Sequence, residues 1–126
     1  MAKNELEERT KRFAVRVIRF VGEFPKNNAG DVLGKQLLRS GTSIGANYRE
    51  ANRGESRNDF IHKIGIVEKE AAETAYWLEL CQETLAVNTS ECSALLQEAN
   101  ELISIFVTIG KHSRARGGSA HRRQAA

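Results

Sequence analysis

Residues 60–85, FIHKIGIVEKEAAETAYWLELCQETL, contain the longest regular pattern in this chain. Apolar or small residues recur in it at alternating steps of four and three. At about 3.6 residues per turn, such residues fall on one stripe of a single helix, as in a bundle or coiled coil. The stripe consists of Phe60, Ile64, Val67, Ala71, Thr74, Leu78, Cys81 and Leu85. We therefore expect one long helix here, packed lengthwise against other helices.

Three further helices are expected around it, at about residues 3–23, 28–53 and 89–114. The apolar stripe of the first is Leu6, Phe13, Val17, Phe20 and Phe24, and that of the last is Cys92, Leu95, Ala99, Leu102, Phe106 and Ile109. Short loops between long helices make neighbours antiparallel. The sequence predicts an all-α, antiparallel up-down-up-down four-helix bundle formed by residues 1–114, with a disordered basic tail at residues 115–126.

The second helix has an unusual stripe, which contains two polar residues. Its heptad positions are Leu33, Leu37, Ser40, Ile44, Asn47 and Ala51. We expect Ser40 and Asn47 to be largely buried and hydrogen-bonded, because a buried polar group needs a partner. Gly34, Gly41 and Gly45 share a neighbouring face and predict close approach of another helix. A phosphate-binding glycine loop is disfavoured, because no Gly-Lys-Ser/Thr follows and no strand precedes.

Charge is strongly segregated along the chain, although the net charge is only +3. The balance is +5 over residues 1–57, −7 over residues 58–110 and +5 over residues 111–126. Such segregation indicates either an anionic partner for the basic part or contact between copies of the chain.

Basic residues form one stripe on each of the first two helices. The candidate nucleic-acid-binding residues are Arg9, Arg12, Arg16, Arg19, Lys35, Arg39, Arg49 and Arg53. Two such stripes on neighbouring helices would make a patch that fits a phosphate backbone. The alternative is a solvated face that is neutralised by nearby glutamates or by the acidic helices of another subunit.

A second apolar stripe lies away from the core stripe on the first and third helices. Its members, the candidate oligomer-interface residues, are Val15, Ile18, Ile66, Trp77 and Leu80. A monomeric bundle needs only one apolar stripe per helix, so the second indicates self-association. The alternative is that Trp77 covers the edge of a wide core.

The residues that would support catalysis or metal binding are sparse. Asp59-x-x-His62 occurs once, whereas di-iron bundles need two Glu-x-x-His pairs and further inward carboxylates. No catalytic residues, metal or cofactor are predicted, and an enzyme such as an rRNA nuclease is disfavoured. The charged start, Met-Ala-Lys-Asn-Glu, and the two core cysteines, Cys81 and Cys92, favour a cytoplasmic protein with reduced thiols. No apolar run is long enough to cross a bilayer, so no membrane partner is expected.

Three segments together resemble a known family. They are residues 37–47, LLRSGTSIGAN, residues 60–64, FIHKI, and residues 69–78, KEAAETAYWL. The chain resembles the bacterial four helix bundle proteins, also called 23S rRNA intervening-sequence proteins, over about residues 6–112. The resemblance implies an up-down bundle, members that assemble as ring-like homopentamers, and kinship with retroelement accessory proteins that bind nucleic acid and a reverse transcriptase. It implies no catalytic residues. Arg49, where members often have a small or apolar residue, and the basic tail depart from the pattern.

These observations lead to two competing hypotheses. The first is a non-enzymatic, self-associating bundle that binds RNA or DNA through phosphates. The second is a structural or protein–protein interaction module with no role in nucleic-acid binding.

Overall fold

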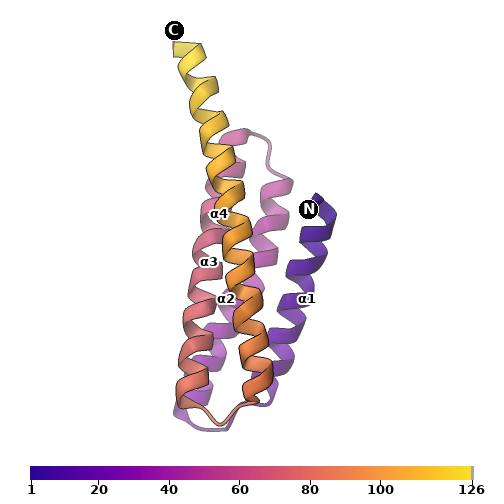
Figure 1. The fold of residues 1–126 in the computed structure, drawn as a ribbon, viewed down its shortest axis with the longest axis vertical. Coiled ribbons are helices and arrows are strands. Elements are labelled where there is room, and N and C mark those ends of the chain that lie inside the picture. The colour runs from indigo at the N-terminus through magenta and orange to yellow at the C-terminus, as the bar shows by residue number, and fades with distance from the viewer. Residues whose placement is uncertain (126) are drawn as a thin grey trace.

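The computed structural model of this protein describes the backbone of residues 1–125 and the side chains of residues 1–116. The backbone of that part forms four helices, α1 (Lys3–Gly22), α2 (Asn28–Asn52), α3 (Arg57–Thr84) and α4 (Thr89–Ala125). They run alternately down and up along one long axis and are joined by short loops (Figure 1). α1 and α3 each pack between α2 and α4. The predicted up-down-up-down four-helix bundle is confirmed.

Side chains from the loops cap three of the helices. The caps accept hydrogen bonds as follows: Asn27 Oδ1 from Gly30 N (2.8 Å), Ser56 Oγ from Asp59 N (3.1 Å) and Asn88 Oδ1 from Glu91 N (3.0 Å). Each cap gives a partner to an N–H group that has none within its helix. These local signals place the starts of α2 and α4 within a residue or two of the predicted positions.

The end of α4 differs from the predicted boundary. The sequence analysis predicts an end near Arg114, but α4 continues as a backbone helix to Ala125 and extends beyond the other helices (Figure 1). No proline follows Arg114 to interrupt the helical hydrogen bonds. The side chains of residues 117–126 lie outside the described part, so the predicted disorder of residues 115–126 stays a prediction.

The core is formed by the stripes predicted for α1, α3 and α4 together with the buried face of α2. All five predicted α1 residues are buried, as are six of the eight on α3, and Phe60 and Leu85 at its ends are half-buried. On α4, Cys92, Leu95 and Ala99 are among the residues with no exposed surface, whereas Ile109 is half-buried. The period of the sequence therefore identifies the faces that lose contact with water.

The register predicted for α2 is supported by the buried Leu37, Ser40, Ile44 and Ala51, but the burial predicted for Asn47 is wrong. Ser40 is fully buried, as expected, but Asn47 is only half-buried and donates a hydrogen bond to Ser43 O within its own helix (2.9 Å). Tyr48, the next residue along α2, is buried and packs edge-on against Phe106, with the two ring centroids 5.2 Å apart. The buried Gly41 and Gly45 lie beside the heptad positions, so the buried face of α2 is wider than the heptad stripe and includes Tyr48.

α4 is long and apolar enough, between Thr89 and Arg116, to cross a membrane by length and composition alone. No such segment was expected, because no uninterrupted apolar run in the sequence is long enough. The core helix of a bundle passes the same test, and the buried stripe of α4 packs against α1 and α3. This feature is therefore weak evidence for a membrane span.

Candidate nucleic-acid interface

The basic stripe of α1 is divided by its position beside α4. Arg9 donates from Nε to Glu98 Oε2 and from Nη2 to Glu98 Oε1, both at 2.7 Å, and it also reaches Glu101 at 3.4 Å. Arg16 donates from Nε (3.1 Å) and Nη2 (3.0 Å) to Glu91 Oε1. Both arginines thus turn towards α4, and the side chain of Arg16 stays 40% exposed beside it.

The two parallel hydrogen bonds between Arg9 and Glu98, here called the fork, shift the pKa of both groups. Its hydrogen bonds to Arg9 lower the pKa of Glu98, and the charges of Arg9 and Arg16 act in the same direction. The hydrogen bonds that Arg9 donates to Glu98 in turn raise the pKa of Arg9. Charge-assisted bidentate pairs of this kind are among the stronger polar contacts in proteins.

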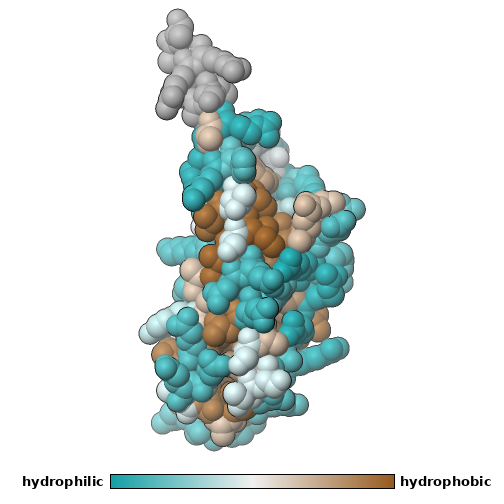
Figure 2. All heavy atoms as spheres, in the orientation of Figure 1, coloured by the Kyte–Doolittle hydropathy of each residue, from teal (hydrophilic) through white to brown (hydrophobic). Residues whose placement is uncertain are grey.

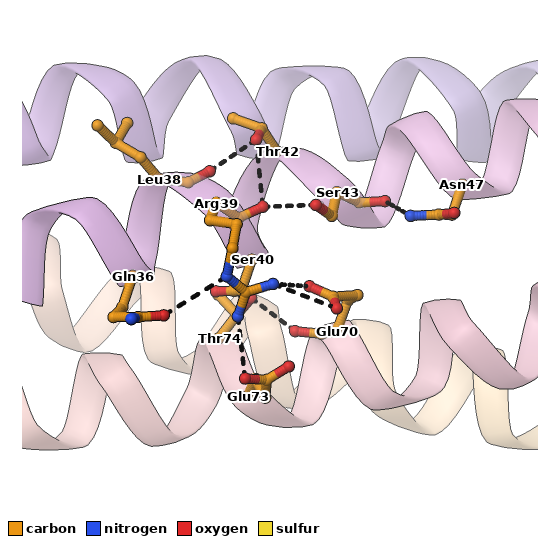
Figure 3. A network of polar contacts seen from close by, with 10 residues as sticks. All are labelled: Gln36, Leu38, Arg39, Ser40, Thr42, Ser43, Asn47, Glu70, Glu73 and Thr74. Atoms are coloured by element: carbon orange, nitrogen blue, oxygen red, sulfur yellow. Dashed lines mark hydrogen bonds and ion pairs between the residues drawn. The ribbon is translucent and has the colours of Figure 1, made fainter.

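The basic stripe of α2 is held in a similar way, but by different helices. Arg39 lies between two carboxylates of α3, Glu70 (3.1 Å) and Glu73 (2.9 Å), as Figure 3 shows. Arg49 lies near two carboxylates of α1, Glu7 (3.9 Å) and Glu8 (3.6 Å). Because Arg9 and Arg16 face α4 while Arg39 faces α3, these paired arginines do not form one continuous patch.

The other four predicted residues are exposed. Arg12 and Arg19 on α1, Lys35 on α2 and Arg53 at the end of α2 make no ion pair with any residue in the described part of the chain. Arg12 and Arg19 are seven residues apart, so they share one stripe of α1. These four cations remain available to an outside partner.

Sequence reasoning missed most of the acidic partners, for a physical reason. It considered neutralisation by glutamates on the same helix or on another subunit, yet several partners lie on neighbouring helices of the same chain. The acidic balance of residues 58–110, which includes Glu70, Glu73, Glu91 and Glu98, was the available signal. Pairing across helices depends on their relative register, which a single-helix pattern does not contain.

The predicted oligomer-interface residues occupy two separate sides of the bundle. Val15 is half-buried and Ile18 is 51% exposed on α1, while Ile66, Trp77 and Leu80 are half-buried on α3. Trp77 packs against the core, and its Nε1 atom is buried with no hydrogen-bond partner in the described residues. α1 and α3 do not pack against each other, so the two groups are separate surfaces.

Several depressions of the described surface lie along α1 and α4. One of about 670 Å³ is bordered by Arg9, Leu96 and Glu101, and one of about 270 Å³ by Arg16, Arg19 and Glu91. A third, of about 390 Å³, is lined by Met1, Leu6, Ser104, Ile105, Thr108 and Ile109. Apolar surface is visible among hydrophilic side chains on the face that carries α4 (Figure 2). Among the described side chains, no three His, Cys, Asp or Glu residues could hold a metal ion together.

By its fold and surface, the chain is a small antiparallel four-helix-bundle protein with charged seams between helices. It matches the family model described as 23S rRNA-intervening sequence protein over residues 2–108, and it belongs to that family. It is also similar to a solved protein of unknown function from the S23 ribosomal protein family of Bacteroides thetaiotaomicron VPI-5482. The two are 40% identical, with a TM-score of 0.74, over 83% of this chain and 97% of that one. No curated protein matches the chain.

Proposed function

We propose that this protein is a non-enzymatic, self-associating accessory protein of the cytoplasm that binds structured RNA through the phosphate backbone. The observation that carries the proposal is the exposure of Arg12, Arg19, Lys35 and Arg53, which have no ion pair within the described residues. Exposed lysine and arginine side chains bind phosphates and release counterions, which gives affinity with little dependence on sequence.

The burial of the aromatic ring nearest the basic residues of α2 supports RNA binding with little sequence preference. Binding of single-stranded bases usually needs exposed aromatic rings on which the bases stack. Tyr48 is buried against Phe106, so it is not available for stacking beside the basic residues of α2. Beside the basic residues of α2, contacts to phosphate rather than to bases are therefore expected.

The test is binding of a structured RNA by the Arg12→Gln/Arg19→Gln variant, compared with a matched Lys26→Gln/Lys69→Gln control. All four residues are exposed, and both variants lose the same charge. We expect the arginine variant alone to bind more weakly and to flatten the slope of log affinity against log salt by about 0.7–0.9 per lost phosphate contact. Equal effects of the two variants, or no binding by the wild type at low salt, would contradict the proposal.

Self-association is proposed because the second apolar surface lies on two different sides. A head-to-tail contact joins one patch to a different patch and forms a ring when the rotation between subunits closes, or an open filament when it does not. A two-fold dimer instead uses the same patch twice. A surface on α1 with Ile18 and a surface on α3 with Trp77 fit the first arrangement. A ring, such as the pentamer that the resemblance implies, would also repeat the basic residues and increase avidity.

The test of self-association is light scattering of the purified chain. We expect a mass several times 14.0 kDa, reduced by Ile18→Glu but not by Ala72→Glu, which introduces the same charge at an exposed position of α3. Ile18 is preferred to Trp77 because Trp77 also packs against the core. A monomer at tens of micromolar would exclude the ring.

The second candidate is a protein–protein interaction module without a nucleic-acid role. It is favoured by the exposed apolar residues Val32 (59%) on α2 and Tyr76 (53%) on α3. A reverse transcriptase is the protein partner that the resemblance implies. This function would replace the first if RNA binding is absent while the apolar surface proves necessary for capture of a purified protein partner.

A further inference from the structure

The arginines of α1 alternate between two environments. Arg12 and Arg19 are exposed and make no ion pair within the described residues, whereas Arg9 and Arg16 are held by carboxylates of α4. All four were predicted to lie in one sector of the helix. Two arginines of this basic stripe are therefore exposed, and the other two form ion pairs within the bundle.

The carboxylates of α4 bind these arginines where a phosphate could otherwise bind. The guanidinium of Arg9 donates two parallel hydrogen bonds of 2.7 Å to the two oxygens of Glu98. The same fork geometry recognises two oxygens of a phosphate group. Glu101, at 3.4 Å, adds a second negative charge beside the same guanidinium. The N–H donors engaged in this way cannot form the same fork with an RNA phosphate until the carboxylate leaves.

The contacts around these pairs allow the arginine side chains to turn outward without opening the core. α1 approaches α2 closely at the glycine faces, where a Cβ on Gly41 would lie 3.0 Å from Val17. The contact of α1 with α4 is the least extensive in the bundle. Depressions border both Arg9 and Arg16 on this side. The ion pairs could therefore be exchanged while α1 stays packed on α2.

We infer that Glu91, Glu98 and Glu101 of α4 form an internal mask that competes with polyanions for Arg9 and Arg16. The inference rests on the proposed RNA-binding function and assigns a regulation to the same stripe. An RNA first meets the exposed Arg12 and Arg19, and a densely charged phosphate chain then displaces the α4 carboxylates. Weaker or smaller anions do not displace them.

RNA phosphates should displace the carboxylates of the two ion pairs, Arg16–Glu91 and Arg9–Glu98, in a definite order. The side chains of Arg16 and Glu91 are 40% and 38% exposed, whereas those of Arg9 and Glu98 are 22% and 17% exposed. Solvent and salt screen the more exposed pair more strongly. Arg16 is therefore the first of the two to exchange its carboxylate for a phosphate.

The test is RNA binding by the mask variant Glu91→Gln/Glu98→Gln. The control is Glu79→Gln/Glu83→Gln, which removes the same charge from exposed glutamates of α3 that make no ion pair in the described structure. We expect the mask variant to bind about tenfold or more tightly than the control. Its log–log salt slope should steepen by about 0.7–0.9 for each arginine that gains a phosphate. Adding Arg9→Gln/Arg16→Gln to the mask variant should abolish the gain.

The outcomes separate this inference from the function on which it rests. If the wild type binds through Arg12 and Arg19 but mask and control variants behave alike, the mask is refuted and RNA binding stands. If the wild type, the mask variant and the control all fail to bind RNA, both are refuted. Circular dichroism and thermal melting establish that the variants are folded. Should the double variant unfold, Glu91→Gln alone, at the more exposed pair, must still steepen the slope relative to Glu79→Gln.

Discussion

At the scale of single residues, one pair of hydroxyl groups links α2 to α3 inside the core. Thr74 Oγ1 and Ser40 Oγ are 2.9 Å apart, both residues are fully buried, and Thr74 also donates to Glu70 O at 2.7 Å. The pair lies beneath the Arg39 contacts to Glu70 and Glu73 (Figure 3). Buried polar groups that find each other in this way favour one register over its neighbours.

The first prediction concerns this pair. Thr74→Val keeps the shape of the side chain but removes the partner of Ser40, so it should lower the free energy of unfolding by about 1–3 kcal/mol. Ser40→Ala should lower the free energy of unfolding less in the Thr74→Val background than in the wild type, because there it removes a hydroxyl that has already lost its partner. Urea unfolding of the four proteins measures this coupling. Strict additivity would show that the two hydroxyls do not interact.

A second residue-scale prediction follows from the buried thiols. Burial raises the pKa of Cys81 to about 12 and also raises the pKa of Cys92. The unfolded chain loses these protons near the ordinary thiol pKa, so above about pH 9 it binds fewer protons than the folded chain. The free energy of unfolding should therefore fall as pH rises from about 9 towards 12, by up to about 1.4 kcal/mol per pH unit for one thiol.

Urea unfolding of the wild type and Cys81→Ala across this range measures the thiol contribution. The variant should show the shallower decline, since it lacks one of the two buried thiols, and Cys92 should account for a remaining part. Parallel curves would mean that Cys81 does not titrate differently in the two states.

At the scale of elements, the glycines of the helices have opposite structural roles. A Cβ on Gly30, in the first turn of α2, would lie 2.1 Å from the backbone oxygen of Pro25. A Cβ on Gly65, inside α3, would meet nothing within 4 Å. The first glycine lets the α1–α2 loop return tightly against the helix, whereas the second only weakens its helix.

The corresponding prediction compares two alanine substitutions. Gly65→Ala should raise the free energy of unfolding by about 0.5–1 kcal/mol through helix propensity alone. Gly30→Ala should lower it, because the loop backbone must move to remove the clash. Thermal melting of both variants tests the contrast. A stabilising Gly30→Ala would show that Pro25 does not approach α2 closely in solution.

At the scale of the whole molecule, the four sides of the bundle are unequal. α2 and α4 both pack extensively on α3, whereas α1 and α4 meet least and are joined by the Arg9 and Arg16 ion pairs. Regions with few packed contacts open at lower free energy than the rest of a protein. α1 is therefore the helix most easily released from the bundle.

Hydrogen exchange provides the prediction at this scale. Amides of α1 should exchange through openings of lower free energy than those at the centre of α3. Raising the salt to about 1 M, where charges are screened within about 3 Å, should widen the difference. Mass spectrometry of peptides from both helices measures it. Equal protection of α1 and α3 at both salt concentrations would show that the α1–α4 side is as firmly closed as the others.

The sequence by itself determined the helices, their antiparallel order and most of the core, because helical period and capping residues act over a few neighbouring positions. It placed Leu37, Val67 and Phe106 correctly by that means. Only the tertiary structure decided that Tyr48 rather than Asn47 completes the buried face of α2, and which arginines are occupied. The fork between Arg9 and Glu98 joins residues far apart in the chain. Its formation depends on the relative register of two helices, which the packing of the whole bundle sets.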